Sequence, residues 1–168
     1  MAKMKNQKIK FNAKIVSGLG AASSTLKRQL PLIRKQFNFI QNCWPGTINL
    51  RLSEPVNLLN VDFETTPIAW TPSGKTTESF GFIEIALVFP GRLKRVQGWL
   101  YLASNSPHRH DNHTFEVITQ KLNLEGVSDC QIYIRSSAIE ISRSGLKKLS
   151  QRGINSNAEY VPQDDSFN

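Results

Sequence analysis

A glycine-containing turn is the first segment of this sequence that is suited to phosphate chemistry. Ser17-Gly18-Leu19-Gly20 follows an alternating segment and precedes a predicted helix start at 23–25. Glycines let backbone N–H groups approach phosphate oxygens, and the N-terminus of a helix adds positive potential. The same residues would also serve as an ordinary tight turn, so the pattern alone leaves both interpretations open.

A Thr-x-Asn pair is the second candidate. Thr47 and Asn49 lie in Pro45-Gly46-Thr47-Ile48-Asn49-Leu50, two residues apart on a predicted strand, so their side chains project from the same face. Hydroxyl and amide oxygens are hard, neutral ligands that could help to hold Mg²⁺ together with phosphate oxygens and water. The alternative is a polar strand face without a ligand.

A histidine-rich loop and a glutamate that follows it form the third candidate. His108, His110 and His113 lie within six residues, a spacing that could bind zinc, but no nearby cysteine completes a ligand set. A solvated loop is the alternative. Glu116 lies beside a predicted strand, where a carboxylate could orient or deprotonate a hydroxyl group. Its alternative role is that of an ordinary surface glutamate.

Short strands dominate the elements that would position these residues. One helix is expected from about residue 23 to Phe37, with Leu26, Leu30, Ile33 and Phe37 on one face. Pro31 predicts a kink or a later helix start near Leu30, because an internal proline costs about 3 kcal/mol. Many short strands with one helix near the start predict a mainly β fold, a small closed or nearly closed barrel. Strands are expected at 8–16, 47–52, 80–89, 96–103, 115–118 and 131–134.

Composition limits the class of protein. A chain of 168 residues favours one domain, and the net charge of +8 is uneven, since ten basic residues precede the first carboxylate at Glu54. Anionic partners are expected: nucleic acid, a membrane surface or phosphorylated ligands. No apolar run is long enough for a membrane span or a secretory signal, and Cys43 and Cys130 are too few for a disulfide framework. We therefore expect a cytoplasmic protein without a membrane partner.

Taken together, the order of these motifs resembles the archaeal-type CTP-dependent riboflavin kinases. The likeness runs from Lys8 to Ile134, and its best motifs are Val16-Ser17-Gly18-Leu19-Gly20 and Pro45-Gly46-Thr47-Ile48-Asn49-Leu50. It implies a compact six-stranded cradle-loop barrel at 8–135, preceded by a basic arm at 1–7 and followed by a polar, partly mobile tail at 136–168. It further implies a monomer that transfers the γ-phosphate of CTP to the riboflavin 5′-hydroxyl to give FMN, with Mg²⁺ as cofactor.

The resemblance also implies roles for individual residues. Thr47 and Asn49 would hold Mg²⁺, while His108 and Glu116 would contact the flavin. Glu116 would in addition hold the reacting hydroxyl and accept its proton. The residues implied for nucleotide binding are Gly18, Leu19, Gly20, Ala21, Ala22 and Ser23 after the first strand, and Gln120, Lys121, Leu122 and Asn123 after Glu116.

This chain departs from the family pattern at several of these positions. Ala21 and Ala22 replace a glutamate and a glycine, Asn123 replaces an arginine, and His108 replaces a threonine. A non-catalytic nucleotide- or flavin-binding barrel is therefore one alternative. A nucleic-acid-binding barrel that uses the basic N-terminal third is another, although aromatic residues are not interleaved with the basic ones as stacking platforms would require.

Overall fold

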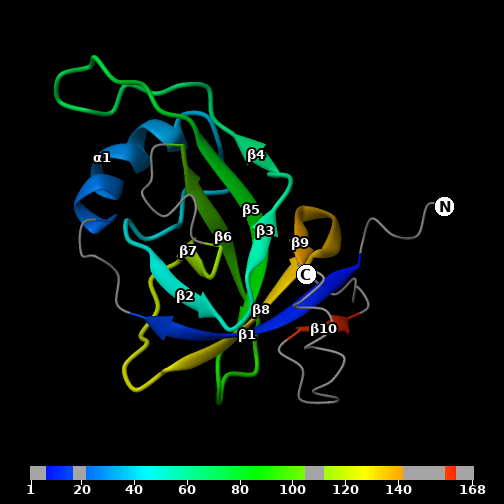
Figure 1. The fold of residues 1–168 in the computed structure, drawn as a ribbon. Coiled ribbons are helices and arrows are strands. Elements are labelled where there is room, and N and C mark those ends of the chain that lie inside the picture. The colour runs from blue at the N-terminus through cyan, green and yellow to red at the C-terminus, as the bar shows by residue number, and fades with distance from the viewer. Residues whose placement is uncertain (1–6, 17–21, 105–111, 142–157, 162–168) are drawn as a thin grey trace.

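The computed structural model describes residues 7–16, 22–104, 112–141 and 158–161, with only the backbone described for 22–24 and 158–161. Its elements, in chain order, are β1 (Lys8–Val16), α1 (Ala22–Arg34), β2 (Ile48–Leu52), β3 (Val56–Leu58), β4 (Phe63–Glu64), β5 (Phe80–Val88), β6 (Val96–Ala103), β7 (Thr114–Thr119), β8 (Asp129–Arg135), the 3-10 turn η2 (Ser136–Ala138), β9 (Ile139–Ile141) and β10 (Ala158–Val161) (Figure 1).

Six of the strands close into an antiparallel barrel. β1 pairs with β2, β2 with β7, β7 with β6, β6 with β5, β5 with β8, and β8 returns to β1. The prediction of a mainly β fold with a closed six-stranded barrel and one helix is therefore confirmed. Within the described ranges, no helix is long and apolar enough to cross a membrane.

The barrel interior is built by the period-two alternation of the strands. In β1, for example, Phe11 and Ala13 are buried, whereas Asn12 and Lys14 between and after them are exposed. β5 is apolar almost throughout because both of its faces are covered. Its Ile83, Ile85 and Leu87 belong to the interior core, while other side chains of the strand face the helix.

Helix α1 covers part of the outer surface of the barrel and forms a second core there (Figure 1). Leu26, Leu30 and Ile33 are completely buried against aromatic side chains, as their helical spacing predicts. The aromatic side chains in this second core include Phe80, Phe82, Trp99 and Tyr101. The face of β6 that carries Trp99 and Tyr101 is thereby ordered by the helix.

The helix bounds differ from the predicted ones. α1 ends at Arg34 rather than near Phe37, because the next N–H groups turn back to the carbonyls of Leu32 and Ile33 in a tighter last turn. The helix begins at Ala22 and not near Leu30, so Pro31 lies inside it, with an exposed side chain. The burial of the apolar face offsets the hydrogen bond that the proline cannot donate.

The ordered chain continues past Arg135, where we expected a polar tail to begin. Ala138 in η2 is completely buried, and Ile139 is buried in β9, which pairs with β3. Farther along, β10 pairs with the first half of β1. The three residues of β9 were missed because they are too few to show a periodic pattern, although they close one side of the barrel core.

Candidate functional site

An opening in the barrel wall lies between β6 and β7. The two strands pair only where Gly98–Leu100 faces Val117–Thr119. Beyond this point β6 continues to Ala103 beside β5 alone, and β7 begins at Thr114 beside β2 alone. The separation of these two strand edges opens the barrel toward its interior.

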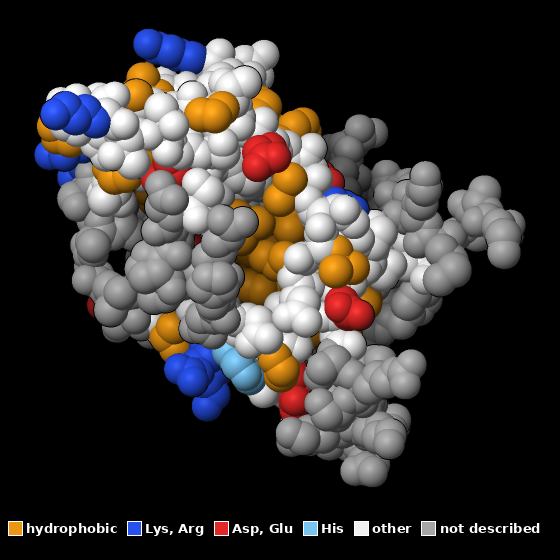
Figure 2. Space-filling view, turned by 45° about the horizontal axis from the view of Figure 1, so that its top comes forward, with side chains coloured by type: hydrophobic (Ala, Val, Ile, Leu, Met, Phe, Trp, Pro, Cys, Tyr) orange, Lys and Arg blue, Asp and Glu red, His pale blue; other side chains and the backbone are white. Residues whose placement is uncertain are grey.

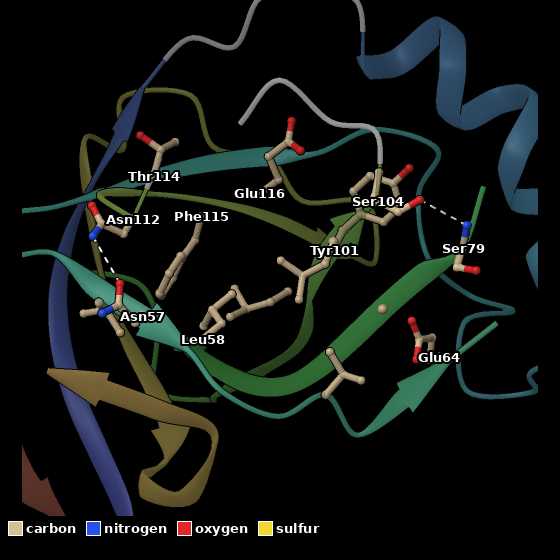
Figure 3. Close-up of a pocket in the computed structure, with 16 residues that line it drawn as sticks. Asn57, Leu58, Glu64, Ser79, Tyr101, Ser104, Asn112, Thr114, Phe115 and Glu116 are labelled. Carbon is tan, nitrogen blue, oxygen red and sulfur yellow. Dashed lines mark hydrogen bonds between the residues drawn. The ribbon is translucent and has the colours of Figure 1, made fainter. Parts of the chain in front are cut away.

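A cavity of about 450 Å³ occupies this opening. Its floor is apolar and includes Leu58, Leu100 and Phe115, and a hollow with hydrophobic side chains at its base is visible near the centre of Figure 2. Its rim is polar, with the side chains of Asn57, Glu64, Ser79, Tyr101, Ser104, Asn112, Thr114 and Glu116 (Figure 3). An apolar floor with a few polar groups, in a volume of roughly 300–1,000 Å³, is typical of a small-molecule site.

Two hydrogen bonds fix the rim of the cavity. The Asn112 side-chain amide donates to Oδ1 of Asn57 on β3 at 3.2 Å, and the backbone N–H of Ser79 donates to Oγ of Ser104 at 3.3 Å (Figure 3). Each bond joins segments that are far apart in the sequence. The polar groups of the rim are thus held in place by the barrel and not by one flexible loop.

Asn49 and Glu116 are brought together by strand pairing. They face each other in the register of β2 and β7, and Val16 at the end of β1 faces Asn49 from the other side. Residues that are directly opposite project to the same face, about 4.5–5.5 Å apart at Cβ. Thr47 immediately precedes β2. The barrel therefore places the predicted metal ligand Asn49 beside the predicted base Glu116, with the end of β1 at Val16 on the other side of Asn49.

The donor set fits a magnesium ion bound with a nucleotide. Mg²⁺ prefers oxygen ligands, keeps several waters and takes its remaining ligands from phosphates. Asn49 and Thr47 offer neutral oxygens, and the half-buried Glu116 supplies a carboxylate in the adjacent position. The described part of the chain holds no group of three or more His, Cys, Asp or Glu side chains that could bind a metal ion, and His108 and His110 of the predicted zinc loop lie outside it.

Tyr101 connects the cavity to the helix. Its hydroxyl donates to Oε1 of the buried Gln29 of α1 at 2.5 Å. Burial, together with the nearby carboxylates of Glu78 and Glu116, raises the pKa of Tyr101 well above its ordinary value. The phenol therefore stays protonated at physiological pH and acts as a hydrogen-bond group, not as a base.

The first predicted nucleotide-binding segment is only partly described. Gly18, Leu19, Gly20 and Ala21 lie outside the described residues, and so does the predicted flavin contact His108. Ala22 and Ser23 form the start of α1. Because β1 ends at Val16, beside Asn49, the chain enters this segment next to the predicted metal ligands.

The second predicted nucleotide-binding segment follows β7. Gln120 and Lys121 are exposed, and the Lys121 ammonium lies 4.6 Å from the ring centre of Trp44, directly before the Pro-Gly-Thr turn. Leu122 packs against the barrel core, and Oδ1 of Asn123 accepts a hydrogen bond from the N–H of Glu125 at 3.0 Å. The structure thus brings Lys121 to Trp44, three residues before Thr47, whereas the side chains of Leu122 and Asn123 serve local packing and turn formation.

Sequence reasoning missed most of the cavity rim. Asn57, Glu64, Ser79, Asn112 and Thr114 line the cavity but belong to no recognisable motif. They converge because of long-range pairing, which gives no local signal in the sequence. The only usable signal was the concentration of polar residues at strand ends near Glu116.

Comparisons with known proteins do not assign the chain to a family. No protein-family model matches the sequence, and no curated protein matches it significantly. The described residues therefore define the class no further than a closed six-stranded barrel with a cavity of small-molecule size.

Proposed function

We propose that this protein is a Mg²⁺-dependent phosphotransferase that transfers the γ-phosphate of a nucleoside triphosphate, CTP by its resemblance, to the 5′-hydroxyl of riboflavin. The observation that carries the proposal is the position of Glu116. Its side chain lines the cavity, and it lies directly opposite Asn49. A single residue thus connects the pocket for an acceptor with the residues suited to metal-bound phosphates.

The shape and polarity of the cavity support a flat acceptor with polar edges. The apolar floor would contact the face of a ring system, and the rim carries carboxylates at opposite sides, Glu116 on β7 and Glu64 on β4 (Figure 3). The side chains of Asn57, Thr114 and Asn112 add hydrogen-bond groups between them. Riboflavin meets this description, with a flat apolar ring that bears polar groups and a hydroxylated chain.

In the proposed reaction, Glu116 accepts a hydrogen bond from the riboflavin 5′-hydroxyl and takes its proton. The hydroxyl oxygen forms a bond to the γ-phosphorus, the bond from this phosphorus to the bridging oxygen breaks, and the electron pair leaves with the nucleoside diphosphate. Thr47 and Asn49 would hold Mg²⁺, which neutralises charge on the phosphate oxygens when bound. Backbone N–H groups at the start of α1 would add positive potential.

The test is FMN formation from riboflavin with CTP or with ATP in the presence of Mg²⁺. We expect turnover with at least one nucleotide and a loss of roughly 10²–10⁴-fold in kcat for Glu116→Gln, the usual contribution of a general base. Glu64→Gln is the matched control, because it removes the other cavity carboxylate. It is expected to alter KM for riboflavin more than kcat.

Asn49→Ala tests the metal ligand separately. It should raise the Mg²⁺ concentration needed for half-maximal activity, and an unchanged metal dependence would exclude Asn49 as a ligand. Absence of FMN with every nucleotide, from folded protein, would disprove the proposed activity. If riboflavin or a nucleotide nevertheless raised the melting temperature, the non-catalytic binding barrel would be the correct interpretation.

A further inference from the structure

A second concave surface lies apart from the cavity and shares no lining residue with it. This groove, of about 880 Å³, is formed by the middle of β1, the end of β2, the start of β8 and the turn that follows β5. The function proposed above does not use it. Its lining differs in character from that of the cavity, because it carries basic side chains.

Two of these basic side chains are placed directly beside each other. Lys14 of β1 and Arg51 of β2 are partners in the strand register, and both are exposed on the outer face of the barrel. Like charges in directly opposite positions destabilise a sheet. Asp129 of β8 faces Lys14 from the other side and compensates only one of the two charges. The groove therefore keeps an excess of positive charge at this point, which favours an anionic ligand.

Arg92 adds a third cation from the wall of the groove. Its guanidinium donates to the backbone carbonyl of Asn123 and lies 5.4 Å from the ring centre of Phe89. These contacts hold the guanidinium in position, and the bond to Asn123 occupies one of its several N–H donors. The charged side chains that line the groove are thus Lys14, Arg51, Arg92 and Asp129, an excess of two positive charges.

Cations continue beyond the groove along the turn between β5 and β6. Lys94 and Arg95 are exposed there, and the fully exposed Leu93 lies before them. Arg95 stacks 4.6 Å from the ring centre of Tyr133, on the outer face of β8. The positive charges are thus spread over β1, β2 and the turn after β5, which favours an extended anion over a single phosphate.

We propose that this groove binds single-stranded nucleic acid through its sugar–phosphate backbone, without sequence preference. A single strand of nucleic acid can enter a concave surface, whereas a flat lipid bilayer cannot. Neutral hydrogen-bonding side chains, Asn12, Ser53 and Gln131, lie between the cations and suit sugar and phosphate oxygens. Phe89, the aromatic side chain among the lining residues, is buried and so offers no face for a base to stack on, which fits backbone binding.

The test measures fluorescence anisotropy of a labelled oligouridylate of about 12 nucleotides over a range of salt concentrations. The groove variant is Lys14→Gln with Arg51→Gln, and the matched control is Lys27→Gln with Lys35→Gln, which removes two exposed cations on and just after α1. Each neutralised phosphate contributes about 0.7 to the slope of log K against log salt for single strands. The groove variant should therefore bind with a slope shallower by about 1.4 and roughly 10- to 30-fold more weakly at low salt, while the control binds nearly as wild type.

Several outcomes would overturn the proposal. Equal losses in the groove variant and the control would show that net charge alone drives binding. No binding of the oligonucleotide at low salt would exclude the site. Displacement by polyglutamate at the same charge concentration would indicate an acidic polypeptide, and binding to phosphatidylserine vesicles without binding to the oligonucleotide would indicate a membrane. Thermal melting checks folding, and the groove variant should be at least as stable as wild type, because its like-charge pair is gone.

Discussion

Gly81 on β5 is the position where the packing of the cavity rim can be tested most directly. It is buried, it lines the cavity, and an ideal Cβ at this position would lie 2.9 Å from Cγ1 of Val61. Real Cβ atoms do not approach so closely, so alanine at this position would force Val61 to move. Val61 is 38% exposed and can shift outward, which limits the strain.

The magnitude follows from two opposing terms. Overpacking costs about 1–3 kcal/mol, and the mobility of Val61 places the expected cost in the lower part of that range, about 1–2 kcal/mol. Gly81 is not among the positive-φ glycines, so alanine would otherwise stabilise the protein by about 0.4–1 kcal/mol through the unfolded state. Gly81→Ala alone should therefore be destabilising by roughly 1 kcal/mol.

The sign should reverse when Val61 is shortened. In a Val61→Ala background the contact at Cγ1 is absent, and the remaining neighbours, Cβ of Leu102 at 3.6 Å and Cβ of Val61 at 3.7 Å, lie at ordinary van der Waals distances. Gly81→Ala should then be neutral or stabilising, with a coupling energy of about 1–2 kcal/mol between the two sites. Urea unfolding of the wild type, both single variants and the double variant measures this energy.

A particular result would refute this reasoning. If Gly81→Ala lowered the free energy of unfolding equally in both backgrounds, the close approach of Val61 would not be the reason for the glycine. The cause would then lie elsewhere, for example in the pairing of Gly81 with Leu102 or Glu64. In thermal unfolding, the predicted destabilisation corresponds to a fall of about 2–4 °C in Tm for a chain of this size.

Two further predictions concern buried polar groups. Tyr101→Phe leaves the amide oxygen of the buried Gln29 without its donor and should cost about 1–3 kcal/mol in unfolding free energy. Tyr133→Phe loses a longer bond of 3.3 Å to Gln131 and should cost less. Equal costs would contradict the assigned role of Gln29. Burial raises the pKa of Cys43 to about 11 and that of Cys130 to about 12, above the ordinary thiol value of 9.0. The unfolded chain thus loses these protons first, so stability should fall as pH rises above about 9, and replacement of both by alanine should make this fall shallower; an unchanged pH dependence in urea unfolding would contradict it.

Much of the barrel could be predicted because several of its strands alternate between buried and exposed side chains, as β1 and β2 do. Buried side chains recur at every second position, as at Phe11 and Ala13 or at Leu50 and Leu52, and this alternation predicts a strand. Helix α1 was recognisable from Leu26, Leu30 and Ile33. Its end was less predictable, because it depends on a tertiary bond: Nη2 of Arg34 donates to the carbonyl of Cys43 at 2.7 Å and so orders the chain that follows.

The cavity could not be predicted in the same way. Glu116 and Asn49 were identified singly, and only the register of β2 with β7 places them side by side. Asn57 and Asn112 carry no pattern at all, since their bond joins β3 to the turn before β7. A local sequence records which residues alternate, but not where a ladder between two strands stops.

The short ladder between β6 and β7 has a consequence for the dynamics of the barrel. Each of the other neighbouring strand pairs of the barrel is joined over a longer stretch of residues. The free energy of local opening should therefore be lowest where Gly98–Leu100 meets Val117–Thr119. A molecule that touches Tyr101 on one edge and Glu116 on the other would hold the two edges together. A ligand in the cavity would then stabilise the barrel against local opening. Slower amide hydrogen exchange along β6 and β7 would report this stabilisation.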